Sequence, residues 1–260
     1  MTEFIGSGTP LTDNGFRDVL QSADLGPAEI WSVLSVETSG CGYLRDRRPK
    51  VLFERHVFSR LTAGRFDEDD PDISQRTAGG YGPAGSHQFD RLNAAIQLDR
   101  IAALKSASWG LGQIMGDNFR PAGFTDVEAM VKSMVASEDN QLRAMVAFMD
   151  TQKLIGTLKA HDWSGFARRY NGPNFAANNY DGLLEHFFER YADGDNPDPT
   201  VRAVQVYLTY RGFKPGPIDG FAGNGTQRAI AAFQQSIGVA QTGKITEALL
   251  EQLSAESSPT

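Results

Sequence analysis

Residues 30–43, IWSVLSVETSGCGY, carry the pattern from which the fold of this chain can be worked out. Their first half is a dense apolar run, and it ends in a single carboxylate, Glu37. Pro27 suits the first turn of a helix, and the two glycines that follow Glu37 suit its end. The sequence therefore predicts a helix from about Pro27 to about Thr38, with Glu37 on the last turn of a largely buried helix.

At that position the carboxyl of Glu37 is expected to have a higher pKa than most glutamates. Burial and the negative end of the helix dipole both disfavour ionisation, so they raise a carboxyl pKa towards the value that a general acid needs. The alternative interpretation is a surface glutamate at a frayed helix end. The position alone does not decide between the two.

Composition describes an ordinary globular protein. The chain has 260 residues, of which 40% are hydrophobic and 22% are charged, which allows one large domain or two unequal ones. Its net charge of −7 does not indicate nucleic acid or an anionic membrane as a partner. No apolar run is long enough to span a membrane, so we expect no membrane insertion. The first residues lack the basic and apolar regions of a signal peptide, so we expect synthesis and folding in the cytosol.

A second candidate carboxylate lies in the most basic segment, residues 41–66. Glu54 occurs there in the phrase LFERH, among seven arginines and lysines. A carboxylate surrounded by so many cations is expected to be ionised. Glu54 then has either a structural role, in an ion pair that fixes the segment, or a catalytic one, and the sequence leaves both open.

Three further stretches could surround a ligand. Residues 78–92, AGGYGPAGSHQFDRL, are too rich in glycine for a helix, and we interpret them as a cleft wall or a small β-hairpin region with Tyr81 as a candidate sugar contact. Residues 108–116, SWGLGQIMG, combine three glycines with Gln113, whose amide can both donate to and accept from a sugar. Four dispersed histidines and one cysteine give no zinc-ligand spacing, so we expect no metal and no cofactor.

The third stretch is RYNGPNF, residues 169–175, a Gly-Pro turn that carries Tyr170 and Asn171. Both side chains could contact a ligand. Tyr170 could equally be a core tyrosine whose hydroxyl has found a partner inside the protein.

The chain divides near its C-terminal end. ADGDNPDP is small, acidic and punctuated by proline, as linkers are, so the predicted domains are 1–192 and 200–260 with a linker at 193–199. Helical periodicity dominates the first domain. The second contains an internal repeat, in which Thr226 and Thr246 are each expected to cap the next helix.

The C-terminal segment is similar to peptidoglycan-binding modules of the small three-helix type. The residues on that pattern that we single out for wall binding are Asp219, Gly220, Phe221, Thr226, Phe233 and Gln234.

The N-terminal part resembles the N-acetylmuramidase domain of endolysins from phages of Gram-negative bacteria. The matching phrases are VETSG, RPKVLFERHVFSRLTAGRF, GGYG, SASWGLGQIMG, DWSGFARRYNGP and NNYD. More distantly, three short motifs are similar to those of goose-type lysozymes and lytic transglycosylases: Glu37-Thr38-Ser39, Gly110-Leu111-Gly112-Gln113-Ile114 and Tyr170-Asn171. Glu37 occupies the place of the catalytic glutamate in both comparisons.

The resemblance implies a mainly α fold, lysozyme-like with a small β-hairpin and loop region, followed by a small three-helix domain. It implies a modular endolysin, acting as a monomer on bacterial peptidoglycan, in which Glu37 is the general acid. Glu54 is the first candidate for the second catalytic group, with Asp46 and Asp90 behind it. Gln113, Tyr170 and Asn171 are expected to hold the glycan, with Trp109 packing beneath or beside it.

Two rival functions stay open at this point. A lytic transglycosylase would use the same glutamate and form 1,6-anhydro products, and a virion component could bind the wall without cutting it. For the endolysin, we expect accumulation in the host cytoplasm until a separate membrane-permeabilising protein opens the way to the wall.

Overall fold

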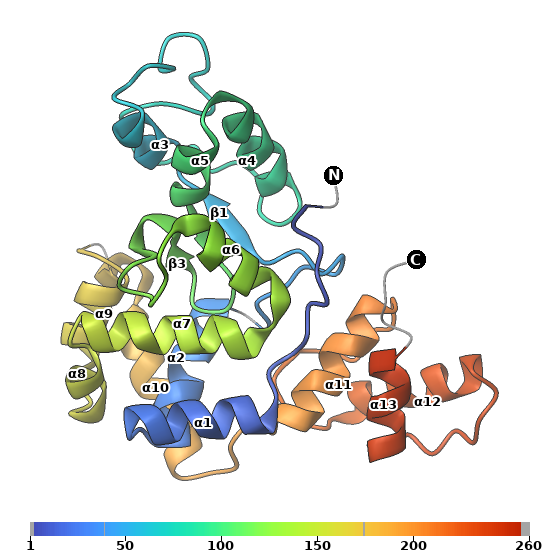
Figure 1. Ribbon diagram of the computed structural model, residues 1–260. Coiled ribbons are helices and arrows are strands. Elements are labelled where there is room, and N and C mark those ends of the chain that lie inside the picture. Colours follow the sequence, from blue (N-terminus) through green and yellow to red (C-terminus); the bar gives the residue numbers. More distant parts are fainter. Residues whose placement is uncertain (1–2, 39, 174, 256–260) are drawn as a thin grey trace.

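The computed structural model describes residues 3–38, 40–173 and 175–255. Ser39 of the Glu37-Thr38-Ser39 motif therefore lies outside the described residues, as do the outermost ends of the two predicted domains. Within the described residues the chain is mainly helical and carries one small sheet, as the sequence predicts (Figure 1).

Most of the chain forms one large group of helices. These are α1 (Asp13–Ala23), α2 (Pro27–Thr38), α3 (Arg55–Leu61), α4 (His87–Leu98), α5 (Arg100–Lys105), α6 (Val127–Ala136), α7 (Glu138–Thr151), α8 (Ile155–Lys159), α9 (Trp163–Tyr170) and α10 (Tyr180–Ala192), with the short 3-10 turns η1 (Gly116–Asn118) and η2 (Phe175–Asn178).

Helix α2 is the centre of this group. It has the bounds that the sequence predicts, and it lies behind α7 and packs along α10 (Figure 1). Its buried side chains point to all sides of the helix, as in a helix surrounded by protein. Because α2 is held from every side, the carboxyl group at its last turn has a fixed position.

The small sheet consists of β1 (Val51–Phe53), β2 (Ala107–Trp109) and β3 (Ile114–Met115), antiparallel and in that order. Val51 pairs with Trp109, and Ser108 pairs with Met115. The sheet does not include residues 78–92, where the sequence allowed a hairpin. There the glycine-rich stretch is irregular, and α4 begins at His87.

A second, smaller core is formed by α11 (Pro199–Tyr210), α12 (Asn224–Ser236) and α13 (Glu247–Ala255). Thr246 caps α13 as predicted, since its hydroxyl accepts from the backbone N–H of Leu249 at 3.2 Å. The cap predicted at Thr226 is wrong. Helix α12 begins two residues earlier, so Thr226 lies inside the first turn and its hydroxyl donates to the carbonyl of Pro215. The linker at 193–199 stays a prediction.

Helix α11 belongs to the smaller core and also contacts α1 of the larger one (Figure 1). Its Arg202 forms a two-pronged ion pair with Glu138 at the start of α7, with N–O distances of 2.5 and 2.9 Å. Both side chains are buried, at 3% and 0% exposure. Glu138 also accepts the backbone N–H groups of Leu11 and Gly42, and Arg202 also donates to the carbonyl of Gly40. We call this set of contacts the Arg202–Glu138 clamp.

Candidate active site

A cleft of about 400 Å³ opens beside the C-terminal end of α2. It brings together five of the residues singled out in the sequence. They come from the end of α2, the residue before α3, the turn between β2 and β3, and the end of α9: Glu37, Glu54, Gln113 and the pair Tyr170-Asn171.

Glu37 is the most perturbed carboxyl group in this cleft. Burial raises the pKa of Glu37 to about 7, and a hydrogen bond from the Asn171 amide, at 2.7 Å to Oε1, opposes that rise without cancelling it. Of the two causes that the sequence suggests, burial and the helix dipole, burial accounts for the raised pKa. At neutral pH a substantial fraction of Glu37 carries a proton that it can give away, as a general acid requires.

Glu54 shares the cleft, but its environment differs from the one we expected. The pKa of Glu54 is raised, because burial outweighs the charge of His56, whose Nδ1 lies 3.4 Å from Oε2. The basic segment does not lower the pKa of this carboxyl, and three of its arginines pair with other carboxylates. These pairs are Arg48 with Asp46, Arg60 with Asp117 and Arg65 with Asp99.

The other two carboxylate candidates lie away from the cleft. Asp46 is held by Arg48 in an exposed loop, at 2.6 Å. Asp90 lies on the surface of α4 beside His87, with a side chain 76% exposed. Of the three candidates for a second catalytic group, the structure brings Glu54 to Glu37.

Tyr170 and Gln113 line the cleft while their polar groups are engaged inside the protein. The hydroxyl of Tyr170 donates to the carbonyl of Gly112 at 2.8 Å, which is the arrangement expected of a core tyrosine. The amide of Gln113 donates to Gly110 and accepts from Ser108. These side chains fix the turn between β2 and β3 against α9, and they thereby shape the cleft wall.

The burial of Trp109 contradicts the prediction that this residue packs against the glycan. Its side chain is completely buried, with 0% exposure, and its indole N–H donates to the carbonyl of Leu104. Residues of a strand alternate between faces, and Trp109 lies on the face that packs against the aromatic ring of Phe4. It supports the sheet from inside and does not reach the cleft.

Tyr81 lies near Glu54. Burial and the negative charge of Glu54 both raise the pKa of Tyr81, which is 38% exposed. Its backbone carbonyl accepts from the side chains of Gln88 and Arg91, so the glycine-rich segment is tied down at this residue. Tyr81 is therefore next to the second carboxylate without being among the residues that line the cleft.

Tyr180 is a cleft residue that no sequence pattern singles out. This residue begins α10 and lines the cleft, and the charge of Glu37 contributes to raising the pKa of its hydroxyl. The phrase NNYD contains it, but nothing local distinguishes a tyrosine that faces a cleft from one that faces the core.

Comparison with known proteins agrees with this geometry. Residues 26–192 match the family model of N-acetylmuramidases. The chain belongs to the N-acetylmuramidase family. As a member of this family, the protein is a peptidoglycan hydrolase. Residues 197–253 match a peptidoglycan-binding domain, which gives peptidoglycan as its partner.

The muramidase is also similar to a solved structure, the crystal structure of Burkholderia AP3 phage endolysin. The two are 36% identical over 71% of this chain and 72% of that one, with a TM-score of 0.66. No curated protein matches. The family resemblance stated from the sequence motifs is confirmed.

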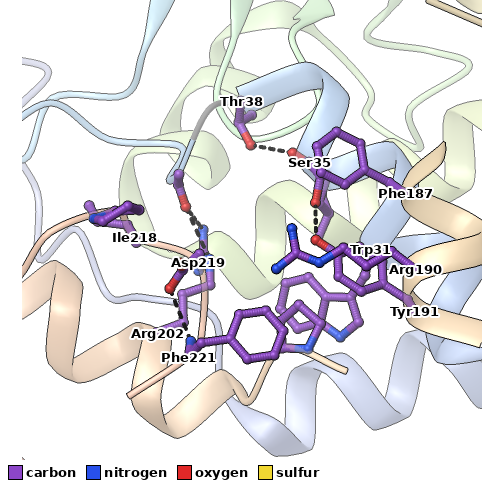
Figure 2. Close-up of a pocket in the computed structure, with 14 residues that line it drawn as sticks. Trp31, Ser35, Thr38, Phe187, Arg190, Tyr191, Arg202, Ile218, Asp219 and Phe221 are labelled. Carbon is purple, nitrogen blue, oxygen red and sulfur yellow. Dashed lines mark hydrogen bonds between the residues drawn. The ribbon is translucent and has the colours of Figure 1, made fainter. Parts of the chain in front are cut away.

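The candidate wall-binding residues of the muramidase fall into two groups. Asp219 and Phe221 line a pocket between the two cores (Figure 2). Thr226, Phe233 and Gln234 are 2%, 1% and 6% exposed, and they hold the module together from inside. Gly220 has φ +78°, and a Cβ there would lie 2.8 Å from Pro197, so its place depends on having no side chain.

Neither a metal nor a membrane span is indicated in the described part of the muramidase. No group of three or more histidine, cysteine, aspartate or glutamate side chains there could hold a metal ion. Among the described helices none combines the length and the apolar character needed to cross a membrane.

Proposed function

We propose that this muramidase is an endolysin that hydrolyses the β-1,4 bond between N-acetylmuramic acid and N-acetylglucosamine, with Glu37 as the general acid. The observation that carries the proposal is the buried Glu37 carboxyl in the cleft, with a pKa of about 7. The similarity to a phage endolysin supports the biological setting.

In the proposed reaction the proton of Glu37 passes to the glycosidic oxygen as the bond from that oxygen to the anomeric carbon breaks. The N–H of Asn171 then faces the new carboxylate and stabilises its charge. A water molecule adds to the anomeric carbon and releases one proton. Glu54 is our candidate for the group that assists this step, either as a base or by stabilising the positive charge on the sugar.

The test is the Glu37→Gln variant, which keeps the shape of the side chain and a hydrogen bond to Asn171. We expect loss of turbidity of outer-membrane-permeabilised cells to slow by a factor of about 10² to 10⁴. Cosedimentation with sacculi and the circular dichroism spectrum should not change. Lysis at a near-normal rate would reject Glu37 as the acid, and a Glu54→Gln variant with full activity would leave Glu54 a structural role.

A lytic transglycosylase is the second candidate, because the motifs similar to those of such enzymes, at Glu37, Gln113 and Tyr170-Asn171, meet in one cleft. Mass spectrometry of the released muropeptides separates the two, since anhydro products are lighter by one water. A protein that only binds the wall would release no muropeptides of either kind.

We also propose that the lysin stays in the host cytoplasm until a separate protein permeabilises the membrane. Expressed alone in the cytoplasm, it should leave cells intact, and coexpression with a pore-forming protein should lyse them. Lysis by the enzyme alone would contradict this route.

A further inference from the structure

His56 is a titratable side chain beside the cleft that the proposed reaction does not use. It lies in the first turn of α3, two residues after Glu54, and its Nδ1 is 3.4 Å from Oε2 of that glutamate. This nitrogen is buried and has no hydrogen-bond partner in the described part of the chain. The carboxylate of Glu54 is thus within ion-pair distance of an imidazole nitrogen that no hydrogen bond engages.

The backbone of Glu54 is fixed, whereas its side chain is not used for capping. The N–H of Glu54 donates to the carbonyl of Ser106 at 2.8 Å, and its carbonyl accepts from the N–H groups of Val57 and Phe58. Glu54 occupies the N-cap position of α3, but its carboxylate forms no capping hydrogen bond. The carboxylate instead lines the cleft, with His56 as its charged neighbour.

The other cations of the surrounding elements are directed away from Glu54. Arg55 is the next residue, but its guanidinium donates to a backbone carbonyl outside the cleft. Arg91 of α4 donates to two further backbone carbonyls. Lys105 of α5, the helix that packs against α3, lies 3.7 Å from the carboxylate of Asp117. Among the described residues, the cation that faces Glu54 is therefore the one that His56 forms when it is protonated.

The remaining titratable groups around Glu54 do not favour its ionisation. Glu37 in the same cleft and Tyr81 in the glycine-rich segment are acids, whose charge is negative whenever it is present. Burial raises the pKa of Glu54, and the charge of His56 opposes that rise. An imidazole ordinarily gains its proton near pH 6.5, which supplies this charge on the acid side of neutrality.

We propose that His56 is a positioning residue for cleavage, which keeps the Glu54 carboxylate ionised and directed into the cleft. The inference rests on the proposed function, because it takes Glu54 as the group that assists the attack of water. It assigns the acid limb of the pH–rate profile to the pair of His56 and Glu54, whereas Glu37 determines the alkaline limb.

The first experiment compares pH–rate profiles of the full-length wild type, His56→Asn and His56→Lys on permeabilised cells. Asparagine offers an N–H near the position of Nδ1 without the charge. We therefore expect the acid limb of that variant to move to higher pH, with the rate at pH 5 falling about threefold or more relative to the rate at pH 7. Lysine restores a positive charge and should return the limb towards its wild-type position. His87→Asn removes an exposed histidine 3.7 Å from Asp90, outside the cleft, and should move neither limb.

The second experiment measures Glu54 without using activity. Carbon-13 NMR of protein labelled at the glutamate carboxyls follows each titration, and the Glu54 signal is the one that disappears in Glu54→Gln. Its midpoint should move to higher pH in His56→Asn, because the opposing charge is lost, and return towards the wild-type value in His56→Lys. A role of His56 in packing alone would leave this midpoint unchanged. The side chain of His56 is 31% exposed, so these variants should keep the fold, which circular dichroism checks.

The outcomes separate this inference from the proposed function. The inference is overturned if the Glu54 midpoint or the acid limb of His56→Asn stays at its wild-type position, or if His56→Lys does not reverse the shift. Full activity of Glu54→Gln overturns it as well. None of these results restores lysis by Glu37→Gln, so the assignment of the general acid is tested independently of His56.

Discussion

Burial of Glu37 has two opposing consequences, one for the pKa of its carboxyl and one for the stability of the fold. A general acid needs a proton at the working pH, and burial supplies it by raising the pKa of this carboxyl to about 7. Because the carboxyl is buried, its ionisation also destabilises the folded state. Glu37 should therefore be a source of instability at alkaline pH.

That instability can be measured with Glu37→Gln. The unfolded carboxyl ionises near 4.5 and the folded one near 7, so above pH 7 ionisation costs the fold about 3 kcal/mol as an upper estimate. The glutamine variant cannot ionise, so its folded state is not destabilised in this way. Denaturant titration should show it to be more stable than the wild type at pH 8, with no such gain at pH 4. An equal gain at both values would mean that packing, rather than charge, is responsible.

The proposed role of Glu37 also predicts the pH profile of cleavage. Activity should fall about tenfold for each pH unit above 7 as Glu37 loses its proton, and it should fall on the acid side as the second group gains one. Asn171→Leu removes a hydrogen bond that lowers the pKa of Glu37, so its alkaline limb should move to higher pH. Asn118→Leu, at another asparagine of the cleft, should not move the limb. A shift of the Asn171 variant to lower pH would contradict the assignment.

At the scale of elements, the sequence predicts best what is encoded locally. Helix α2 has its predicted bounds because Pro27 and the glycines after Thr38 act within one turn. The sequence does not predict the strands, because two or three residues form a strand only when a distant segment pairs with them. The burial of Trp109 is not predictable for the same reason, because the register of β1 and β2 decides which way its side chain points.

The Arg202–Glu138 clamp is the clearest example of a contact that the sequence does not predict. Glu138 and Arg202 are 64 residues apart, and neither has a neighbour in the sequence that reveals the pairing. Burial opposes ionisation of Glu138, but the charge of Arg202 and the hydrogen bonds around the carboxylate keep its pKa below the usual range. Two residues of ordinary appearance thus join α7 to α11.

Substitutions in the clamp should be strongly coupled. Arg202→Met leaves Glu138 buried and unpaired, at an expected cost of about 3 to 5 kcal/mol in unfolding free energy. The double variant with Glu138→Met should recover much of that loss, since it removes both charges. Calorimetry of the two single variants and the double one measures the coupling, with Arg228→Met as the exposed control. Additive losses would mean that the pair contributes little as a pair.

At the scale of the whole molecule, the two cores depend on each other. A chain that ends at residue 195 keeps Glu138 and loses Arg202, so it should melt at a lower temperature than the full protein. Glu138→Gln should then act with opposite signs, lowering the melting temperature of the full chain and raising that of the short one. Differential scanning calorimetry at pH 7 measures both, and equal effects in the two chains would refute the dependence.

The buried carboxylate of Glu138 also limits which second domains this muramidase can inherit. A recombination event that replaces residues 200–260 must bring a cation to the position of the Arg202 guanidinium, or the carboxylate stays uncompensated in the interior. A neutral residue in place of Glu138 would remove the restriction at the cost of the present partner. The Arg202–Glu138 clamp therefore favours inheritance of the two parts together. A chimeric lysin that carries another second domain needs a neutral residue at position 138, or a cation from the new domain beside Glu138.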